Sequence, residues 1–351
     1  MLTLPPKTSR RITRACYLAR VQDRPVAPDG TANAAVTSST LVIPTLRRPY
    51  SLRRSLAGVR VQTRQFDQVL VSVRPEDKDS RDVIATADGP AVREILVHRP
   101  GAVAARNAAM DVATGDICVF LDDDAVPPPE WHELLVQHFE ADSRIGAVGG
   151  RDRIYHDGRL VVGHQPHVGT VRPYGRFIGL HHLGTGEARD VDVLKVVNKS
   201  VRLGQFPWLR FDENLRGNGA EHYEDWALTL AVKDAGYRVI FDPAIWVDHY
   251  EAERIDVDQR FNPEGRAVYD RAFNQTYAGV RYLPLLKAMV HACYALAVGS
   301  RSEPGLLAFL YRLPRGGVRP SVSALNRAWR GRLAAIRFAW RLRRFGKDLP
   351  E

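Results

Sequence analysis

The hydrophobic and polar positions of the first 150 residues follow two different periods. Short apolar runs bounded by turn residues predict strands, and apolar positions spaced three or four apart predict helices. The predicted strands cover residues 40–45, 68–73, 94–97 and 116–121, and the predicted helices cover 47–61, 101–113 and 130–140. The polar stretch 74–80 is expected to be a loop. This order predicts an α/β fold with a mainly parallel, doubly wound sheet flanked by helices.

The pattern is less regular after residue 140. A helix is predicted from Glu224 to a glycine C-cap at Gly236. Residues 151–190 are rich in Gly, His and Arg with weak periodicity, which indicates a long loop or irregular hairpin over a site. Further strands are predicted at 145–150, 191–197, 237–241 and 244–247.

Three regions follow from these patterns. Residues 1–36 are basic and then rich in Pro, Ala, Thr and Asn, so we expect a poorly ordered lead-in. Residues 37–250 hold the α/β domain. Residues 251–351 are expected to form a helical and basic C-terminal region.

Three consecutive carboxylates, Asp122, Asp123 and Asp124, follow the buried strand 116–121. Carboxylates this close repel one another unless a cation lies among them, and Mg²⁺ or Mn²⁺ prefers such oxygen ligands. The carboxyl ends of strands are also where open α/β sheets bind ligands. A solvated acidic turn is the alternative interpretation for the three acids alone.

Composition limits the cellular setting. Three widely spaced cysteines form no metal-ligand pattern, so we expect a reducing compartment, the cytoplasm. Neither a signal peptide nor a transmembrane helix is expected, and residues 283–298 are predicted to form a buried or interfacial helix. The net charge is +10, and residues 301–351 hold 12 Lys/Arg against 3 Asp/Glu, a net +9. The near-neutral remainder argues against nucleic acid as a partner.

The C-terminal stretch 326–345 carries tryptophans and leucines among many arginines. A basic amphipathic helix of this kind suits the anionic inner face of a membrane, which would make the protein peripheral there. The alternative is a helix docked on the α/β domain with its arginines solvated.

Several motifs, taken together, resemble the family 2 glycosyltransferases of GT-A fold. The resemblance covers roughly residues 38–250 and is carried by segments in a fixed order. These segments are Val42-Ile43-Pro44-Thr45, Ala105-Arg106-Asn107-Ala108, Phe120-Leu121-Asp122-Asp123-Asp124, Glu224-Asp225-Trp226 and Ala235-Gly236-Tyr237. It implies a metal-dependent, inverting transfer of a sugar from a nucleotide-diphospho-sugar to a hydroxyl acceptor.

The resemblance also implies roles for matched residues. Asp122 and Asp124 would be the carboxylates of a DXD motif, with Asp124 on Mn²⁺ or Mg²⁺ and Asp122 toward the ribose and the metal's waters. His249 would complete the metal site. Asp225 would be the catalytic base, and Glu224 is the alternative base or an acceptor-positioning group. Favourable charge at a helix N-terminus is the structural alternative for both acids.

Other matched positions would surround the donor and the acceptor. The residues expected to contact the nucleotide-sugar are Pro44, Thr45, Arg47, Arg74, Asp77, Arg106, Asp123 and Asn198. Trp226 would lie beside the acceptor or pack in the core. The second strand departs from the family pattern, because the aspartates that help to read the base in relatives are replaced by Ser72-Val73-Arg74.

Two other function classes stay open at the sequence level. A metal-dependent nucleotidyltransferase or phosphohydrolase would leave the Glu224–Asp225 helix unexplained and would need a phosphate loop that the sequence lacks. A non-catalytic protein that binds anionic polymers would not need the acidic triplet. For the transferase, the basic C-terminal region suggests a glycan or lipid-linked acceptor in cell-envelope polysaccharide synthesis.

Overall fold

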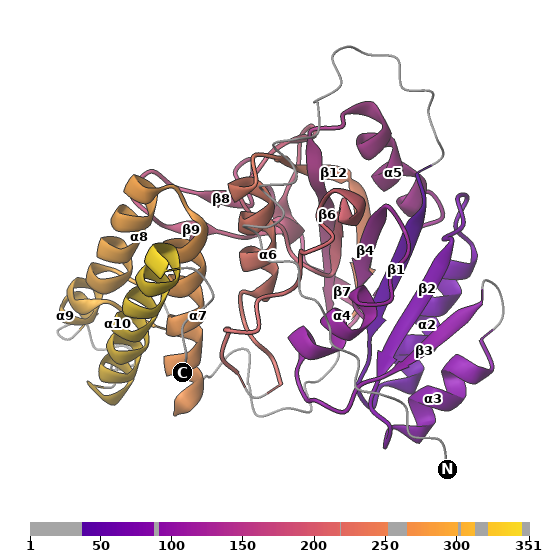
Figure 1. The fold of residues 1–351 in the computed structure, drawn as a ribbon, viewed down its shortest axis with the longest axis horizontal. Coiled ribbons are helices and arrows are strands. Elements are labelled where there is room, and N and C mark those ends of the chain that lie inside the picture. The colour runs from indigo at the N-terminus through magenta and orange to yellow at the C-terminus, as the bar shows by residue number, and fades with distance from the viewer. Residues whose placement is uncertain are drawn as a thin grey trace.

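The structure is a computed structural model that describes residues 37–87, 91–217, 219–251, 265–300, 303–312 and 322–345. The lead-in expected at 1–36 lies outside these residues. The first half alternates strands and helices as the pattern predicts (Figure 1). Its elements are β1 (Ser39–Pro44), α2 (Pro49–Arg60), β2 (Gln68–Val73), α3 (Lys78–Ala85), β3 (Val92–Leu96), α4 (Ala102–Met110) and β4 (Ile117–Leu121).

One expectation in this half is wrong. Part of the polar stretch 74–80 is helical, because α3 begins at Lys78. Asp77 caps this helix: its side chain accepts a hydrogen bond from the Ser80 backbone amide at 3.2 Å. An aspartate at the N-cap satisfies one of the amides that a helix leaves unpaired in its first turn. The polar residues that indicate a loop are therefore the start of a short capped helix.

The central sheet has the strand order β10-β12-β6-β11-β4-β1-β2-β3. The strands of the first half pair in parallel, which brings their carboxyl ends to one edge. β11 (Asn198–Val201) lies antiparallel between β4 and β6 (Ile145–His156), and β6 pairs in parallel with β12 (Arg238–His249). The fold is thus α/β with a mainly parallel sheet flanked by helices, as expected.

The second half differs from the prediction in its strand boundaries. The strand expected at 191–197 instead begins at Asn198, where pairing with both β4 and β6 becomes possible. The two strands expected at 237–241 and 244–247 are one strand, β12, with a register shift between Asp242 and Trp246. Pro243 and the neighbouring irregularity interrupt the apolar pattern without ending the strand.

The region 151–190, expected to be a long loop, contains several short elements. The loop holds β7 (Arg159–Leu160), β8 (Thr170–Val171), β9 (Phe177–Ile178), the 3₁₀ turn η1 (His181–Leu183) and β10 (Arg189–Asp190). The other elements of this half are β5 (Ala125–Val126), α5 (Trp131–Ala141), η2 (Leu203–Gln205) and α6 (Glu224–Asp234). The helix predicted from Glu224 is therefore confirmed.

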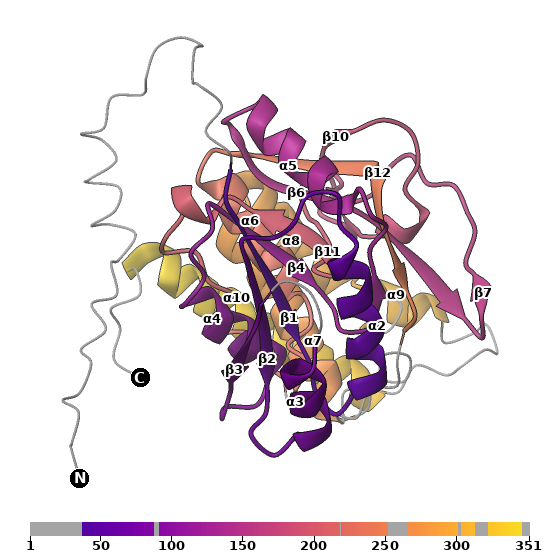
Figure 2. The ribbon, with the colours of Figure 1, turned by 90° about the vertical axis from the view of Figure 1, so that its right-hand side faces the viewer.

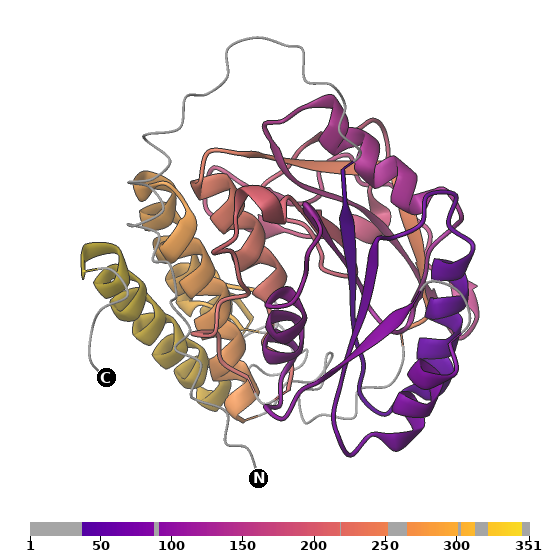
Figure 3. The same cartoon turned by 45° about the vertical axis from the view of Figure 1, so that its right-hand side comes forward.

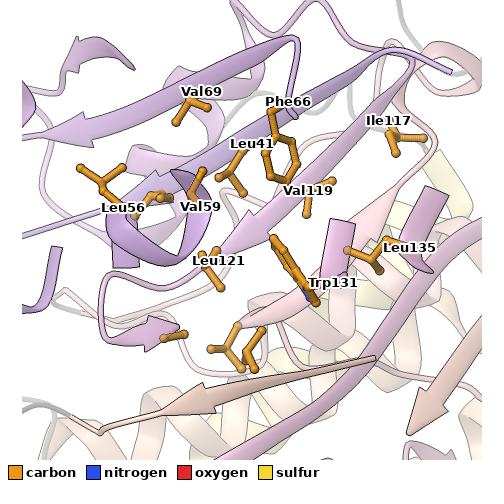
Figure 4. Close-up of a cluster of buried hydrophobic side chains, with 14 of the residues drawn as sticks. Leu41, Leu56, Val59, Phe66, Val69, Ile117, Val119, Leu121, Trp131 and Leu135 are labelled. Carbon is orange, nitrogen blue, oxygen red and sulfur yellow. The ribbon is translucent and has the colours of Figure 1, made fainter. Parts of the chain in front are cut away.

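Hydrophobic side chains cover both faces of the sheet. Helices α2, α3 and α5 cover one face of the sheet (Figure 2). There Leu41 and Ile43 of β1 belong to the same cluster as the fully buried Trp131 (Figure 4). On the other face, Val42 of β1 packs with residues of α4 and α6. Successive side chains of a strand point to opposite faces, so a strand covered on both sides is apolar throughout. This explains the unbroken apolar runs in the sequence.

The C-terminal region is helical, with α7 (Arg266–Tyr282), α8 (Leu285–Ala297), α9 (Leu306–Arg312) and α10 (Val322–Phe345). These helices gather on one side of the sheet next to α6 (Figures 1 and 3). The helix expected at 283–298 is α8. Within the described residues, no helix combines the length and the hydrophobicity needed to cross a bilayer. The proposed division at residue 250 falls between β12 and α7.

α10 is a docked helix, as in the alternative interpretation, but it packs mainly on α7 of the C-terminal region rather than on the α/β domain. Its buried positions form one stripe against α7, with Ala328, Ala335 and Ala339 fully buried. Gly331 permits close approach, because a Cβ there would lie 2.4 Å from the Tyr269 carbonyl oxygen. Trp340 also packs against the cluster between these helices. The apolar side of α10 is thus largely used inside the protein.

Candidate active site

The acidic triplet is anchored to the carboxyl end of β1. Thr45 Oγ1 donates a hydrogen bond to Asp123 Oδ2 at 2.7 Å, and Arg48 Nη1 lies 3.1 Å from Asp123 Oδ1. The same Arg48 nitrogen is 3.5 Å from Asp124 Oδ2. Burial, together with the charge of Asp124, raises the pKa of Asp123 to about 7. Asp123 therefore fixes the turn, while Asp122, with 27% of its side chain exposed, faces outward.

His249 joins the triplet at the end of β12. It pairs in register with Ala125 of β5, the residue after the triplet, and its Nε2 lies 3.2 Å from Asp124 Oδ1. One ligand atom each from Asp122, Asp124 and His249 lies within 4.8 Å of the others. Two carboxylate oxygens and an imidazole nitrogen are a donor set that fits Mn²⁺, and also Mg²⁺ through the oxygens. The structure thus brings the three predicted ligands together.

A buried ion pair lies behind His249. Asp152 of β6 is fully buried, and its Oδ2 is 3.7 Å from His249 Nδ1. Lys195 Nζ forms an ion pair with the same Asp152 oxygen. Burial alone would raise the pKa of Asp152, but Lys195 and His249 hold that pKa well below its ordinary value. A carboxylate behind the imidazole is a partner that metal-ligating histidines commonly have.

Arg106 of α4 connects the triplet to α6. Its guanidinium is buried, with Nη2 2.9 Å from Asp122 Oδ1 and Nη1 3.2 Å from Glu224 Oε1. The next residue, Asn107, exchanges two hydrogen bonds with the backbone of Phe211, at 2.9 and 2.8 Å. These contacts hold α4, the triplet and the approach to α6 in one arrangement.

Glu224 and Asp225 occupy the first turn of α6, after Tyr223 in a left-handed conformation (φ 71°). Burial and the adjacent Asp225 charge raise the pKa of Glu224 to about 7. Burial also raises the pKa of Asp225, and the Lys199 charge opposes the rise. Lys199 is fully buried, and its Nζ donates to the Asp225 carbonyl oxygen at 2.9 Å. Carboxyl groups whose pKa values are raised by burial and by neighbouring charge are candidates for proton transfer.

Some predicted donor contacts lie beside this group rather than within it. Thr45 is at the triplet, and Pro44 ends β1 just before it. Arg47 has a left-handed backbone (φ 52°), and its amide donates to the Asp77 carboxylate. Arg74 contacts Glu76 Oε1 at 2.9 Å and the His98 carbonyl oxygen at 2.6 Å. Asp77 is thus engaged as a helix cap and a tie to the loop after β1.

Asn198 and Trp226 are held by protein partners. The Asn198 amide donates to the carbonyl oxygens of Arg151 and Ile245, and it accepts from Trp131 Nε1 at 2.9 Å. The Trp226 ring stacks on Phe177 at 4.8 Å between centroids. Both residues brace the elements around the site, and neither joins the cluster at the acidic edge.

Sequence reasoning missed four charged residues of this region: Arg48, Asp152, Lys195 and Lys199. Asp152 and Lys199 are fully buried, whereas Arg48 and Lys195 are partly exposed, and the ion pairs or hydrogen bonds of all four join segments distant in sequence. A signal was available for Lys199, which stands in a run that is otherwise apolar or uncharged from Val196 to Val201. A lysine inside such a run is costly to bury unless it is paired.

The comparisons with known proteins agree with this geometry. Residues 40–202 match the model described as glycosyl transferase family 2. The matched segment runs from β1 past β11, so it includes the triplet, Arg106 and Lys199. α6 and His249 follow the matched residues. No curated protein matches the chain in sequence.

Two solved structures share the fold. One is S. aureus TarS 1–349 in complex with UDP-GlcNAc, 13% identical, with 88% of this chain and 92% of that chain covered at a TM-score of 0.56. The other is GalNAc-T7 with UDP, GalNAc and Mn²⁺, also 13% identical with a TM-score of 0.56. The match covers 89% of this chain but 57% of GalNAc-T7. At this identity the likeness shows the fold, which is of GT-A type.

Proposed function

We propose that the protein is a metal-dependent, inverting glycosyltransferase that uses a nucleotide-diphospho-sugar. The observation that carries the proposal is the meeting of Asp122, Asp124 and His249 within 4.8 Å, with Arg106 linking Asp122 to Glu224. The family match of residues 40–202 supports sugar transfer over nucleotidyl transfer, phosphate hydrolysis or simple binding of anionic polymers. A nucleotide would lie along the carboxyl edge, near Thr45, Arg47 and Asp123.

Asp124, His249 and Asp122 would hold Mn²⁺ or Mg²⁺. When bound, such an ion neutralises the charge that develops on the leaving nucleoside diphosphate. The chain's own groups prepare this site: Asp152 orients the His249 ring, and Asp123 fixes the turn through Thr45 and Arg48.

Asp225 is the base in this proposal. Glu224 is fixed by its ion pair with Arg106, whereas the Asp225 carboxylate accepts the Trp226 backbone amide at 2.8 Å. Asp225 would take the proton of the acceptor hydroxyl while that oxygen attacks the anomeric carbon opposite the diphosphate, which inverts the configuration. Lys199, which donates to the Asp225 carbonyl oxygen, would hold this turn of α6 in place.

The acceptor is proposed to be the hydroxyl of a glycan or lipid-linked glycan, in cell-envelope polysaccharide synthesis. The proposed location is the cytoplasm, at the inner face of the membrane. The support is the excess of positive charge in residues 301–351. Trp226, which follows Asp225 at the start of α6, would lie beside the acceptor.

Thermal unfolding with a panel of nucleoside diphosphates, with and without Mn²⁺, tests the donor site. A ligand at about 100 times its Kd adds roughly 2.7 kcal/mol to the free energy of unfolding. We expect a Mn²⁺-dependent shift for one base, absent in Asp124→Ala and His249→Ala and kept in the control Glu130→Ala, an exposed acid. If no nucleotide shifts the transition of the wild type, the donor site is wrong. With a sugar donor, the anomeric configuration of the product, read by NMR, tests inversion.

A further inference from the structure

Helices α8 and α9 expose an unusual number of large apolar side chains. They are Leu285 (57% exposed), Leu286 (74%), Met289 (52%), Leu306 (41%), Leu307 (59%), Leu310 (50%) and Tyr311 (64%). Single exposed apolar residues are ordinary on soluble proteins, but a cluster of them marks a contact surface. We call these seven residues the α8–α9 face.

The two helices are held together at their junction. Gly299 and Pro304 form an antiparallel bridge, and the Gly305 amide donates to the Val298 carbonyl oxygen at 2.7 Å. Each helix buries another side, through Ala288 and Ala295 in α8 and through Phe309 in α9. The exposed leucines are therefore the outer side of a packed pair of helices.

Two arginines of α10 tie this helix to the chain just before α8 and α9. The buried Arg332 donates to the carbonyl oxygens of Pro304 and Glu303, just before α9. Arg343 donates to the carbonyl oxygens of Arg281 and Leu283, just before α8. α10 is thus fixed to the start of both apolar helices.

The opposite side of α10 is a stripe of arginines. Arg330, Arg337, Arg341 and Arg344 are exposed and follow one another at helical spacing, opposite the buried stripe of Ala328, Ala335 and Ala339. In the described part of 265–345 the acids are Asp270 and Glu303, which are only 6% and 1% exposed. The exposed charges of this described part are therefore positive.

We propose that the α8–α9 face and the arginine stripe of α10 form a docking surface for an anionic phospholipid bilayer. Leucines that enter the acyl boundary and arginines that reach lipid phosphates are the combination by which proteins lie on membranes without crossing them. This differs from the expectation for 326–345 alone, because the apolar side of α10 faces α7 and the insertion surface is α8–α9. It extends the proposed membrane location and does not rest on the donor chemistry.

Charge disfavours a second copy of the chain as the occupant. A symmetric dimer places the same patch of each subunit in one interface. The arginine stripes would then approach each other with no exposed acid among the described residues of 265–345 to pair with. A bilayer rich in acidic lipid supplies the missing negative charge.

Vesicle co-sedimentation of the full chain tests the surface. The probes are vesicles of phosphatidylcholine alone and of phosphatidylcholine with phosphatidylglycerol, at low and high salt. The variants are the pair Leu286→Ser with Leu307→Ser and the pair Arg337→Ser with Arg341→Ser. Val162→Ser, at a residue 80% exposed in another region, and Arg159→Ser are the matched controls. Thermal unfolding checks that each variant is folded.

We expect wild type and controls to bind the anionic vesicles, more weakly at high salt, and to bind neutral vesicles poorly. Each leucine that inserts contributes about ten-fold to partitioning, and each arginine near the surface about five-fold. Both double variants should therefore lose most of their vesicle binding. The proposal is overturned if wild type does not bind anionic vesicles, or if the leucine pair binds as tightly as wild type. The proposal is also overturned if the wild type forms a dimer and does not bind vesicles, and if the leucine double variant is monomeric. That result would assign the α8–α9 face to a second copy of the chain.

This experiment is separate from the nucleotide test. Vesicle binding needs no donor, and the seven residues of the α8–α9 face include none of the proposed metal ligands or bases. A chain that binds vesicles but no nucleotide leaves the docking surface standing and removes the transferase proposal. A chain that binds a nucleotide with Mn²⁺ but no vesicle removes the docking surface and leaves the transferase proposal standing.

Discussion

Replacing Arg106 with leucine tests how the acidic edge is held together. The buried guanidinium contacts Asp122 Oδ1 at 2.9 Å and Glu224 Oε1 at 3.2 Å. Leucine retains part of the apolar stem and removes the cation from both carboxylates. Glu224 is affected more than Asp122, because 14% of its side chain is exposed against 27% for Asp122. Water can replace the arginine less completely at Glu224.

The size of the effect follows from this geometry. Two unit charges separated by 3.2 Å interact by about 5 kcal/mol at an effective dielectric constant of 20. Removing one partner of a buried pair costs about 3–5 kcal/mol. We therefore expect Arg106→Leu to lower the free energy of unfolding by about 3 kcal/mol at pH 8, where Glu224 is ionised in the wild type.

The pH dependence of this loss has a definite sign. Glu224 titrates near 4.5 in the unfolded chain, whereas burial raises its folded pKa to about 7, with Arg106 opposing the rise. Without Arg106 the folded pKa is higher still, so the folded variant binds the proton more tightly than the unfolded chain does. Wild type and variant therefore both lose stability as the pH rises from about 4.5 to 7, and above pH 7 only the variant continues to lose it. The loss caused by Arg106→Leu should thus be larger at pH 8 than at pH 5, by about 1.4 kcal/mol at most, and the remainder should not depend on pH.

Urea unfolding at pH 5, 6.5 and 8, in the presence of EDTA, measures this difference. Arg106→Lys keeps a positive charge and should lose less than leucine does. Arg210→Leu removes an exposed pair with Asp111, 2.8 Å apart, and should cost less than about 1 kcal/mol at every pH. An equal loss for Arg106→Leu at pH 5 and pH 8 would refute the assigned role of Glu224.

Three further outcomes are expected. Asp152→Asn should weaken Mn²⁺ binding about 10- to 100-fold by calorimetry, because His249 loses its charged partner; unchanged affinity would exclude an orienting role. Asn198→Ala should cost about 3 kcal/mol in urea unfolding, because it leaves the Trp131 indole and two buried carbonyl groups without this amide; a loss under 1 kcal/mol would contradict that bracing. Burial lowers the pKa of His132 to about 4 from 6.5, so the folded state favours neutral imidazole. Stability should fall by about 3 kcal/mol between pH 6.5 and 4 in wild type relative to His132→Phe, and parallel pH profiles would reject this.

The first half of the fold and the core of the site were predictable from sequence. β1, β2 and β4 are apolar on both faces, so short uninterrupted runs reveal them. The acidic triplet directly follows such a run, and α6 has a periodic pattern with a glycine after its last turn. In each case the signal lies within a few neighbouring residues.

The remaining features depend on contacts between distant segments. β11 begins at Asn198 because its hydrogen-bond partners lie in β4 and β6, on either side of it. The apolar residues before Asn198 have no such partners and form no strand, although their local pattern predicts one. Asp77 looks like a loop residue until the helix that it caps is seen. Lys199 and Asp152 are charged residues whose burial is explained only by Asp225 and Lys195. The local sequence pattern does not predict such distant partners.

The strand order has a consequence for how the chain folds during synthesis. β1 to β4 are neighbours in both sequence and space, so this half can form from local crossovers as it leaves the ribosome. The other half must wait for β11 to enter between β4 and β6 and for β12 to pair beside β6. Asp122 and Asp124 are made early, and His249 is the last residue of β12. The three proposed ligands therefore meet only when β12 has joined the sheet, so metal capture would mark the end of domain folding rather than nucleate it.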